Sequence, residues 1–449
     1  MSATSTGTTT TSAEAVRRPS SQVLGLIARN LRQFGMVLVL ILLLLFFQLQ
    51  TGVALTPGNI INIIQGNAYV LILAVGMVLV IIAGHIDLSV GSVAAFVGVV
   101  VALLIQDGGL PWYLAALLGL VLGLVVGAWQ GFWVAVVGIP AFIVTLAGML
   151  LFRGLNQVFG KSTTIPVPDQ IIYFGTASLP EVGPSTGFNN LTVLLGLAGV
   201  VVLVLAEVRK RRNARKLGAP IGPVWSSVVR IVLLGAAILF ATYLFASAPV
   251  GRSFPIAGII LLILVIIYAF LAARTPLGRH VYAVGGNRAA AQLSGVNVRR
   301  VNFFVMMNMS FLAAVAAIVF IGRSTSSGPA DGTGWELDAI AAVFIGGAAV
   351  SGGIGTVIAA VIGGLVIAVL NNGLQLLGVQ ADITQVIKGL VLLLAVALDV
   401  YNKSQGKPSI LGFLQRGLRR SAGTGDVGPS DTVVPPADPS PPRSTSRQQ

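Results

Sequence analysis

The 449-residue chain has no cysteine, only two histidines and only 14 carboxylates. Without cysteine it can form neither a disulfide nor a thiolate metal site. So few histidines and acids leave little material for metal binding or acid–base catalysis. Charged residues make up 9% of the chain, whereas soluble proteins have about 25%. This is too little charge to cover a soluble enzyme of this size, and we predict no catalytic residue and no metal ligand.

Apolar residues dominate instead, with 55% of the chain hydrophobic and 54 glycines besides. The net charge of +14 could indicate a nucleic-acid partner, but its placement argues against one. Lys and Arg gather in short segments between apolar runs, as they do on the cytoplasmic side of membrane proteins. No basic stripe is interleaved with aromatic residues, as single-stranded nucleic acid requires. The partner predicted by composition is the lipid bilayer, and no nucleic acid.

Apolar runs of membrane-spanning length recur along the chain. A helix needs about 20 residues to cross a hydrocarbon core of about 30 Å, so the sequence predicts an all-α polytopic membrane protein with about 10–12 transmembrane helices. The candidate runs are 34–55, 62–83, 88–105, 112–137, 141–158, 190–207, 228–248, 255–273, 301–322, 338–352, 355–378 and 383–401. Only a glycine-rich stretch separates the tenth and eleventh, which can also form one broken or re-entrant element.

Both ends of the chain are polar. Residues 1–33 and 402–449 are rich in Ser, Thr, Pro and charge, which predicts disordered tails around a transmembrane domain at 34–401. With the N-terminus inside, every strongly basic segment falls on the inner side. The outer segments then carry only Lys161, Arg252 and Arg323. The positive-inside rule therefore predicts that both termini are cytoplasmic.

Glycine recurs at every fourth position of the fourth run, at Gly119, Gly123, Gly127 and Gly131. These residues share one helix face, where another helix backbone can approach closely. Packing within one protomer is the favoured interpretation, and a subunit interface is the alternative.

Acidic residues open two of the runs. Asp87 precedes the third run, where an N-cap is the simplest role for it. A charge in a membrane segment also marks transport paths, so Asp87 and Ser89 are candidates for a path or gate. Asp338 opens the tenth run in the same way and is a third candidate.

Other polar side chains lie inside the runs. Arg153 and Lys388 lie near enough to a predicted outer edge to snorkel to the interface, so neither requires a functional role. Asn371 and Asn372 in the eleventh run are candidates for contact with a passing solute, or for hydrogen bonds to neighbouring helices.

The segment 274–301 carries five arginines and no acid. Asn287 is placed to cap a short helix at 288–294, which Gly295 ends. A capped helix on the cytoplasmic face can dock a soluble partner, although a solvated connecting loop is the alternative. The candidate docking residues are Gly285, Gly286, Asn287, Ala289, Ala290 and Gly295.

Five blocks carry a resemblance to a known family. They are AGHIDLSVGS at 83–92, GIPAFIVTL at 138–146, the loop 278–298 with GGN at 285–287, GWELDAIAA at 334–342 and IKGL at 387–390. In this order they resemble the permease subunits of ABC importers for monosaccharides, of the ribose/xylose type. The common family pattern has glycine in place of His85, so the role of that histidine is open.

The resemblance implies the type II ABC importer permease fold in a bacterial-type plasma (inner) membrane. It also implies a second permease copy, an external sugar-binding protein and a separate cytoplasmic ATPase that holds ATP and Mg, with no cofactor on this chain. Because family members commonly have fewer than twelve spans, 190–248 is predicted to be an extra helix pair. The cargo could also be a nucleoside or a branched-chain amino acid. An ion-coupled secondary transporter is the alternative from another class.

Overall fold

The computed structural model describes residues 19–184, 186–218, 223–249 and 251–404. Residues 1–401 form one compact unit and residues 402–449 a second, and the fold described below is that of the first. The predicted tails at 1–18 and 405–449 lie outside the described residues. Within the described part, α-helices make up almost all of the regular structure, with one short π-helix and one two-stranded sheet.

The long helices are α1 (Pro19–Thr51), α2 (Pro57–Ile82), α3 (Val90–Gln106), α4 (Trp112–Phe132, continued by the π-helix η1, Trp133–Val137), α5 (Ala141–Phe159), α7 (Asn190–Lys216), α8 (Val224–Ala246), α9 (Ile256–Arg274), α12 (Val298–Ser324), α14 (Val357–Leu376) and α15 (Ala381–Ser404). The short elements are β1 (Ile165–Pro166), α6 (Asp169–Thr176), α10 (Pro276–Gly286), α11 (Arg288–Leu293), β2 (Ser326–Ser327) and α13 (Trp335–Ile345).

Eight of the described helices are long and apolar enough to cross a membrane: α2, α4 with η1, α5, α7, α8, α9, α12 and α14. Two shorter apolar helical stretches lie at Gly35–Thr51 and Val90–Gln106. The predicted all-α polytopic fold is confirmed. One difference is that α1 begins at Pro19, inside the segment for which the sequence predicts a disordered tail.

The tenth predicted span, 338–352, does not exist as a span. Its helix, α13, covers 11 residues and is about 16 Å long at 1.5 Å per residue, roughly half of a hydrocarbon core. Glycines border it at both ends: Gly334 has φ +80° and Gly347 has φ +86°, a conformation that favours glycine. The chain is then irregular until α14 begins at Val357. The broken-element interpretation is therefore the correct one.

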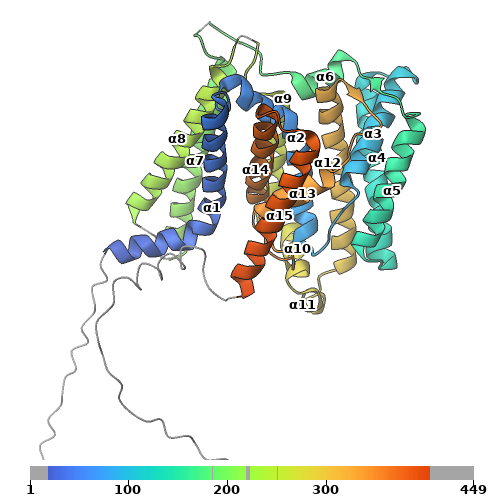
Figure 1. The fold of residues 1–449 in the computed structure, drawn as a ribbon. Coiled ribbons are helices and arrows are strands. Elements are labelled where there is room, and N and C mark those ends of the chain that lie inside the picture. The colour runs from blue at the N-terminus through green and yellow to red at the C-terminus, as the bar shows by residue number, and fades with distance from the viewer. Residues whose placement is uncertain (1–18, 185, 219–222, 250, 405–449) are drawn as a thin grey trace, which may run out of the picture. The chain divides into compact units, whose positions relative to one another are not determined.

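Helices α2 and α12 form the centre of the bundle. Both are buried over most of their length, as expected of a helix that is apolar all round. Helix α12 packs against α2, α3, α4 and α6, and α2 packs against α9, α13 and α14 (Figure 1). The surrounding helices α4, α5, α7, α8 and α9 expose many large apolar side chains. In a membrane protein such a surface faces lipid or a second subunit.

The glycine face of α4 packs inside the protomer, as favoured from the sequence. Gly123 and Gly127 lie against the α12 backbone at Ser310 and Met307, and Gly119 lies against Val101 of α3. Gly131 meets Phe303.

Gly127→Ala should lower the thermal unfolding midpoint of the purified protein. A Cβ at this position would lie 2.6 Å from Met307 Cα and 2.8 Å from its carbonyl oxygen, so α4 and α12 would have to separate, at a cost of about 1–3 kcal/mol. The matched control is Gly154→Ala on α5, where a Cβ meets nothing within 4 Å. A melting curve that shifts equally for both variants would contradict this packing.

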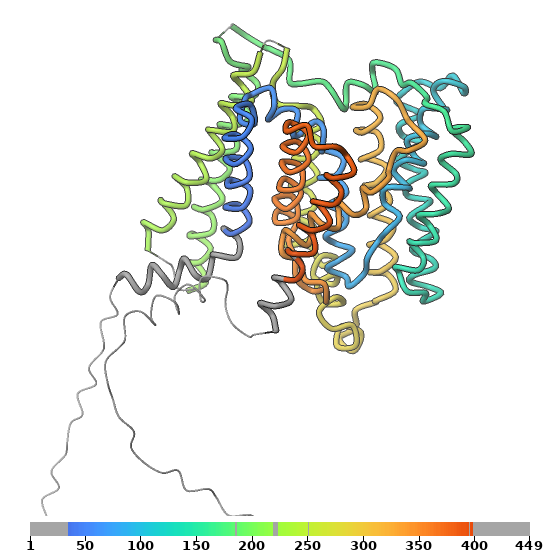
Figure 2. The backbone as a smooth tube through the Cα atoms, viewed as in Figure 1, coloured from blue at the N-terminus to red at the C-terminus, as the bar shows by residue number. Residues whose placement is uncertain are grey.

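Helices α7 and α8 form a helical hairpin within 190–248, and the prediction that this pair is additional to the family's usual spans stays a prediction. They pack on each other, with Gly196 against Thr242, and α8 makes a smaller contact with α2. The tube in Figure 2 shows the two helices running side by side at the edge of this unit, with α3, α4 and α5 at the opposite edge.

A small cap joins the C-terminal ends of α5 and α12. Strands β1 and β2 pair antiparallel, with Ile165 opposite Ser327. Helix α6 lies on α12 through a glycine–glycine contact, because a Cβ on Gly175 would meet the backbone of Gly322 and a Cβ on Gly322 would meet that of Gly175.

Candidate functional site: the coupling loop, the α3–α13 contact and the buried amides

The predicted docking helix is present. Asn287 Oδ1 accepts a hydrogen bond from Ala290 N at 2.9 Å and so caps α11, and Gly295, at φ +83°, follows the helix. Thr275 caps α10 in the same way, through Gly278 N at 3.2 Å. The exposed side chains of Ala289 and Ala290 lie on α11. The local capping signals were thus sufficient to predict α11.

The end of α10 is pressed against the end of α2. A Cβ on Gly285 would lie 1.6 Å from Ile82 O and 2.8 Å from Gly353 N, and Gly353 N donates to the same Ile82 oxygen at 2.8 Å. Three backbone segments therefore meet at this point, from α2, α10 and the irregular chain after α13. Gly286 is different, since a Cβ there meets nothing within 4 Å. The end of α10 is therefore in direct backbone contact with the end of α2 and with Gly353.

A cavity of about 210 Å³ lies beside this contact, and His85, Asn287, Arg288 and Asn302 are among its lining residues. Nε2 of His85 and Oδ1 of Asn302 are buried and make no hydrogen bond in the described structure. Burial lowers the pKa of His85 below its usual 6.5. His85 thus lies beside the α10–α11 segment, and its role, open from the sequence, is not assigned by this position alone.

Asp87 is fully buried and does not cap α3. Its Oδ1 accepts from Ser89 N at 2.8 Å and from Ser89 Oγ at 2.6 Å, while Ser89 itself occupies the N-cap position. The predicted N-cap at Asp87 is wrong, because the chain stays non-helical through Leu88 and the carboxylate closes a turn before the helix starts. Gln130 Nε2 donates to Ser89 Oγ at 2.7 Å, which ties the turn to α4.

The acids of α13 are held by basic residues from two other helices. Lys388 Nζ lies 2.9 Å and 3.0 Å from the two carboxylate oxygens of Asp338. An Arg153 guanidinium nitrogen lies 3.8 Å from Glu336 Oε1. Arg153 and Lys388 thus each lie beside an acid of α13, a pairing that the sequence did not predict.

The first turns of α3 and α13 abut. A Cβ on Gly91 would lie 2.2 Å from Gly332 O, and a Cβ on Gly332 would lie 2.2 Å from Gly91 O. The same Cβ on Gly91 would be 2.7 Å from a carboxylate oxygen of Glu336. Glu336 therefore sits at the N-terminal end of α3, where the helix dipole favours a negative charge.

The two asparagines of α14 bond to α2. Asn372 and Asn59 exchange amide hydrogen bonds of 2.9 Å and 3.0 Å, and Asn371 Nδ2 donates to Asn67 Oδ1 at 3.4 Å. Helix-to-helix bonding, one of the two interpretations open from the sequence, describes these contacts. Sequence reasoning overlooked Asn59, Asn67 and Gln130, although an amide inside an apolar run is a signal that could have found them.

The structure distributes the predicted residues over separate places. The docking residues gather at α10–α11 beside His85. Asp87 and Ser89 form one buried cluster, Asp338 a second and the α14 asparagines a third. A path or gate role for these residues stays a prediction.

The comparisons with known proteins cover nearly the whole bundle. Residues 59–396 match the family described as the branched-chain amino acid transport system / permease component. The chain belongs to this permease family. The permease is also 39% identical over 387 residues to the xylose transport system permease protein XylH of Escherichia coli (strain K12), covering 84% of this chain and 94% of that protein.

Two further relatives are also named as sugar permeases. XylH of Haemophilus influenzae is 36% identical over 378 residues, covering 84% of this permease and 98% of its own length. The ribose import permease protein RbsC of Escherichia coli (strain K12) is 35% identical over 353 residues, covering 78% and 87%. No solved structure matches. With its apolar helices and this family, the chain is a multi-pass inner-membrane protein and a transport subunit.

Proposed function

We propose that this permease is the membrane subunit of an ATP-driven importer and forms the path for a monosaccharide such as xylose or ribose. The observation that supports this function is the match to the xylose permeases, which covers 94% or more of the length of those proteins. The sugar is delivered by an external binding protein. ATP and Mg are held by a separate ATPase, since the chain has no phosphate-binding loop.

The ATPase docks on the cytoplasmic α10–α11 segment, with α11 inserted into a groove of that subunit. The support is mechanical. A short capped helix stands at the end of the bundle, and Gly285 presses the end of α10 onto Ile82 without a side chain between them. A push on α11 therefore reaches α2 and the chain that follows α13.

Helix α13 acts as the gate. It is too short to span, glycines flank it at both ends, and its acids are held by Arg153 and Lys388 from different helices. Exchanging those ion pairs lets it move between arrangements as a rigid piece. Asp87, Ser89 and Asp338 line the path when it opens between two permease copies, and Asn371 and Asn372 border it.

Deletion of the gene in its own host should abolish uptake of radiolabelled D-xylose or D-ribose and leave leucine uptake intact. In the complemented strain, orthovanadate, an inhibitor of ABC ATPases, should block sugar uptake. In ATP-loaded membrane vesicles, a protonophore should not block sugar uptake. If the deletion abolished leucine uptake and left sugar uptake intact, the cargo would be an amino acid and not a sugar. Uptake that follows the proton gradient would instead support the ion-coupled class.

A further inference from the structure

Helix α7 ends in a strongly basic segment, one face of which is exposed. Its apolar part, 190–208, is about 28 Å long at 1.5 Å per residue and fills a hydrocarbon core. The helix then continues to Lys216, so its last two turns stand in the headgroup layer. At 100° per residue, Arg209, Arg212 and Lys216 fall within about 60° of one another on one helix face. All three are exposed.

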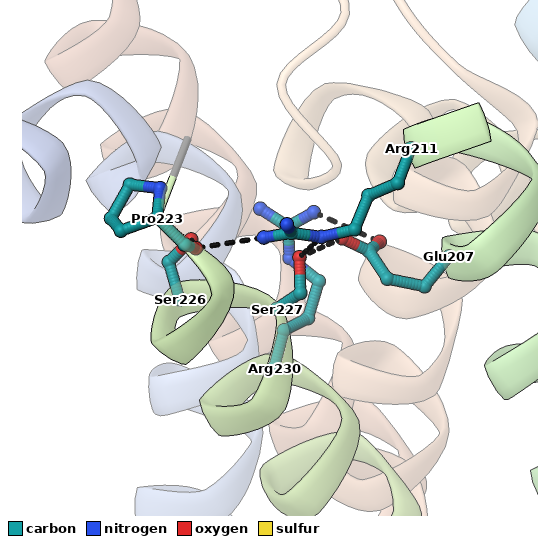
Figure 3. A network of polar contacts seen from close by, with 6 residues as sticks. All are labelled: Glu207, Arg211, Pro223, Ser226, Ser227 and Arg230. Carbon is teal, nitrogen blue, oxygen red and sulfur yellow. Dashed lines mark hydrogen bonds and ion pairs between the residues drawn. The ribbon is translucent and has the colours of Figure 1, made fainter. Parts of the chain in front are cut away.

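The opposite side of the same segment is fixed to α8 by a polar network (Figure 3). Ser227 Oγ donates to Glu207, and Arg230 lies 3.4 Å from the other carboxylate oxygen. Arg211 donates to Ser227 Oγ and to Pro223 O, each at 2.7 Å. This network holds the basic end of α7 in place and engages the one carboxylate of the hairpin.

Glu207 is the only acid between residues 190 and 249. Within the part of the chain that the structure describes, no carboxylate pairs with Arg209, Arg212 or Lys216. Among the described residues, therefore, these three cations lie on one face without a carboxylate that neutralises them. Such a face attracts an external anion of high local concentration.

The surroundings of the hairpin indicate which anion this is. Exposed apolar side chains cover the rest of α7 and α8, including Val202, Leu205, Leu233 and Phe240, so the hairpin faces lipid wherever a second subunit does not cover it. Trp225, half exposed at the same end of α8, has the amphipathic ring that favours the headgroup layer. The nearest anions to the basic face are therefore phospholipid headgroups.

We propose that the Arg209–Arg212–Lys216 face of α7 binds the headgroups of anionic phospholipids, of which phosphatidylglycerol is the test case. The guanidinium groups donate paired hydrogen bonds to phosphate oxygens, and Lys216 adds a point charge. The role is independent of the cargo and of the ATPase. It assigns to the α7–α8 hairpin an anchoring contact with the anionic leaflet.

The absence of cysteine permits a specific test. The full chain with Asn213→Cys, at an exposed position of the same helix, is labelled with a fluorophore and reconstituted alone into phosphatidylcholine vesicles. The vesicles contain a small fraction of either phosphatidylglycerol or phosphatidylcholine that carries a nitroxide near its glycerol backbone. At low salt, the relative association constant from quenching should favour phosphatidylglycerol by about fivefold or more.

Arg209→Gln, Arg212→Gln and Lys216→Gln together should bring this preference close to one. High salt should do the same to the parent protein by screening, and this second measurement keeps the test valid if the triple variant fails to reconstitute. The matched control removes three exposed basic residues elsewhere, by Lys161→Gln, Arg252→Gln and Arg323→Gln, and should retain the preference. Equal quenching by both lipids at low salt, or an unchanged preference in the α7 triple variant, would overturn the proposal.

Discussion

Gly285→Ala should abolish substrate uptake while Gly286→Ala, one residue further on, leaves uptake near the parent level. The added methyl group at Gly285 would lie 1.6 Å from Ile82 O, and a backbone oxygen cannot move without displacing α2. Overpacking of this kind costs about 1–3 kcal/mol, which lowers the population of the docked arrangement by about fivefold to 100-fold. Uptake and substrate-stimulated ATP hydrolysis are measured in vesicles that contain the permease together with the ATPase and the binding protein that we propose as its partners.

The pair of variants separates coupling from folding. Both add one methyl group to adjacent glycines of the same short helix, and a Cβ on Gly286 meets nothing within 4 Å. Gly285→Ala should still insert into the membrane and should retain basal ATPase activity when assembled, with the stimulation by substrate lost. Equal uptake in the two variants would show that the α10–α2 contact does not transmit movement.

Removing the charge of Lys388 should destabilise the permease more than removing any exposed basic residue. Lys388→Met leaves the Asp338 carboxylate, 8% exposed, without its cation, and breaking a buried ion pair from one side costs about 3–5 kcal/mol. The expected result is a fall of several degrees in the thermal unfolding midpoint in detergent, with loss of uptake. Lys210→Met, at an exposed position of α7, is the matched control and should change neither.

The double variant Lys388→Met with Asp338→Asn should recover most of the lost stability, because no uncompensated charge remains in the bundle. Uptake should recover less than stability, since α13 would then have lost one of the two ion pairs that we propose hold the gate. A single Lys388→Met variant that melts like the parent protein, or a double variant no more stable than the single, would mean that the pair is not formed.

Features that depend on neighbouring residues could be predicted from the sequence. A run of about 20 apolar residues is enough to predict a spanning helix, and Asn287 with Gly295 is enough to predict α11, since capping acts within one turn. The glycine face of α4 predicted a close helix contact for the same reason. Its partner, α12, could not be predicted because periodicity describes one helix at a time.

Features that depend on pairing across the bundle were missed. Arg153 and Lys388 each lie near the end of an apolar run, and the runs themselves do not indicate that Glu336 and Asp338 approach them. The length of α13 was overestimated because apolar residues continue after Ile345, although Gly346 and Gly347 end the helix. The place of Asp87 before an apolar run predicts a cap, whereas α3 begins three residues later, at Val90, and the carboxylate bonds to Ser89 instead.

The reciprocal amide bonds between Asn59 and Asn372 restrict how the permease can move. A slide of α14 along α2 by one helical turn, about 5.4 Å, would strand both amides in an apolar layer, where each unpaired polar group costs several kcal/mol. Rotation of α14 about its own axis would separate them as well. The two helices therefore behave as a single rigid strut. A change of shape that keeps these bonds therefore moves α2 and α14 together, and the irregular residues 346–356 before α14 can change conformation without breaking the bonds.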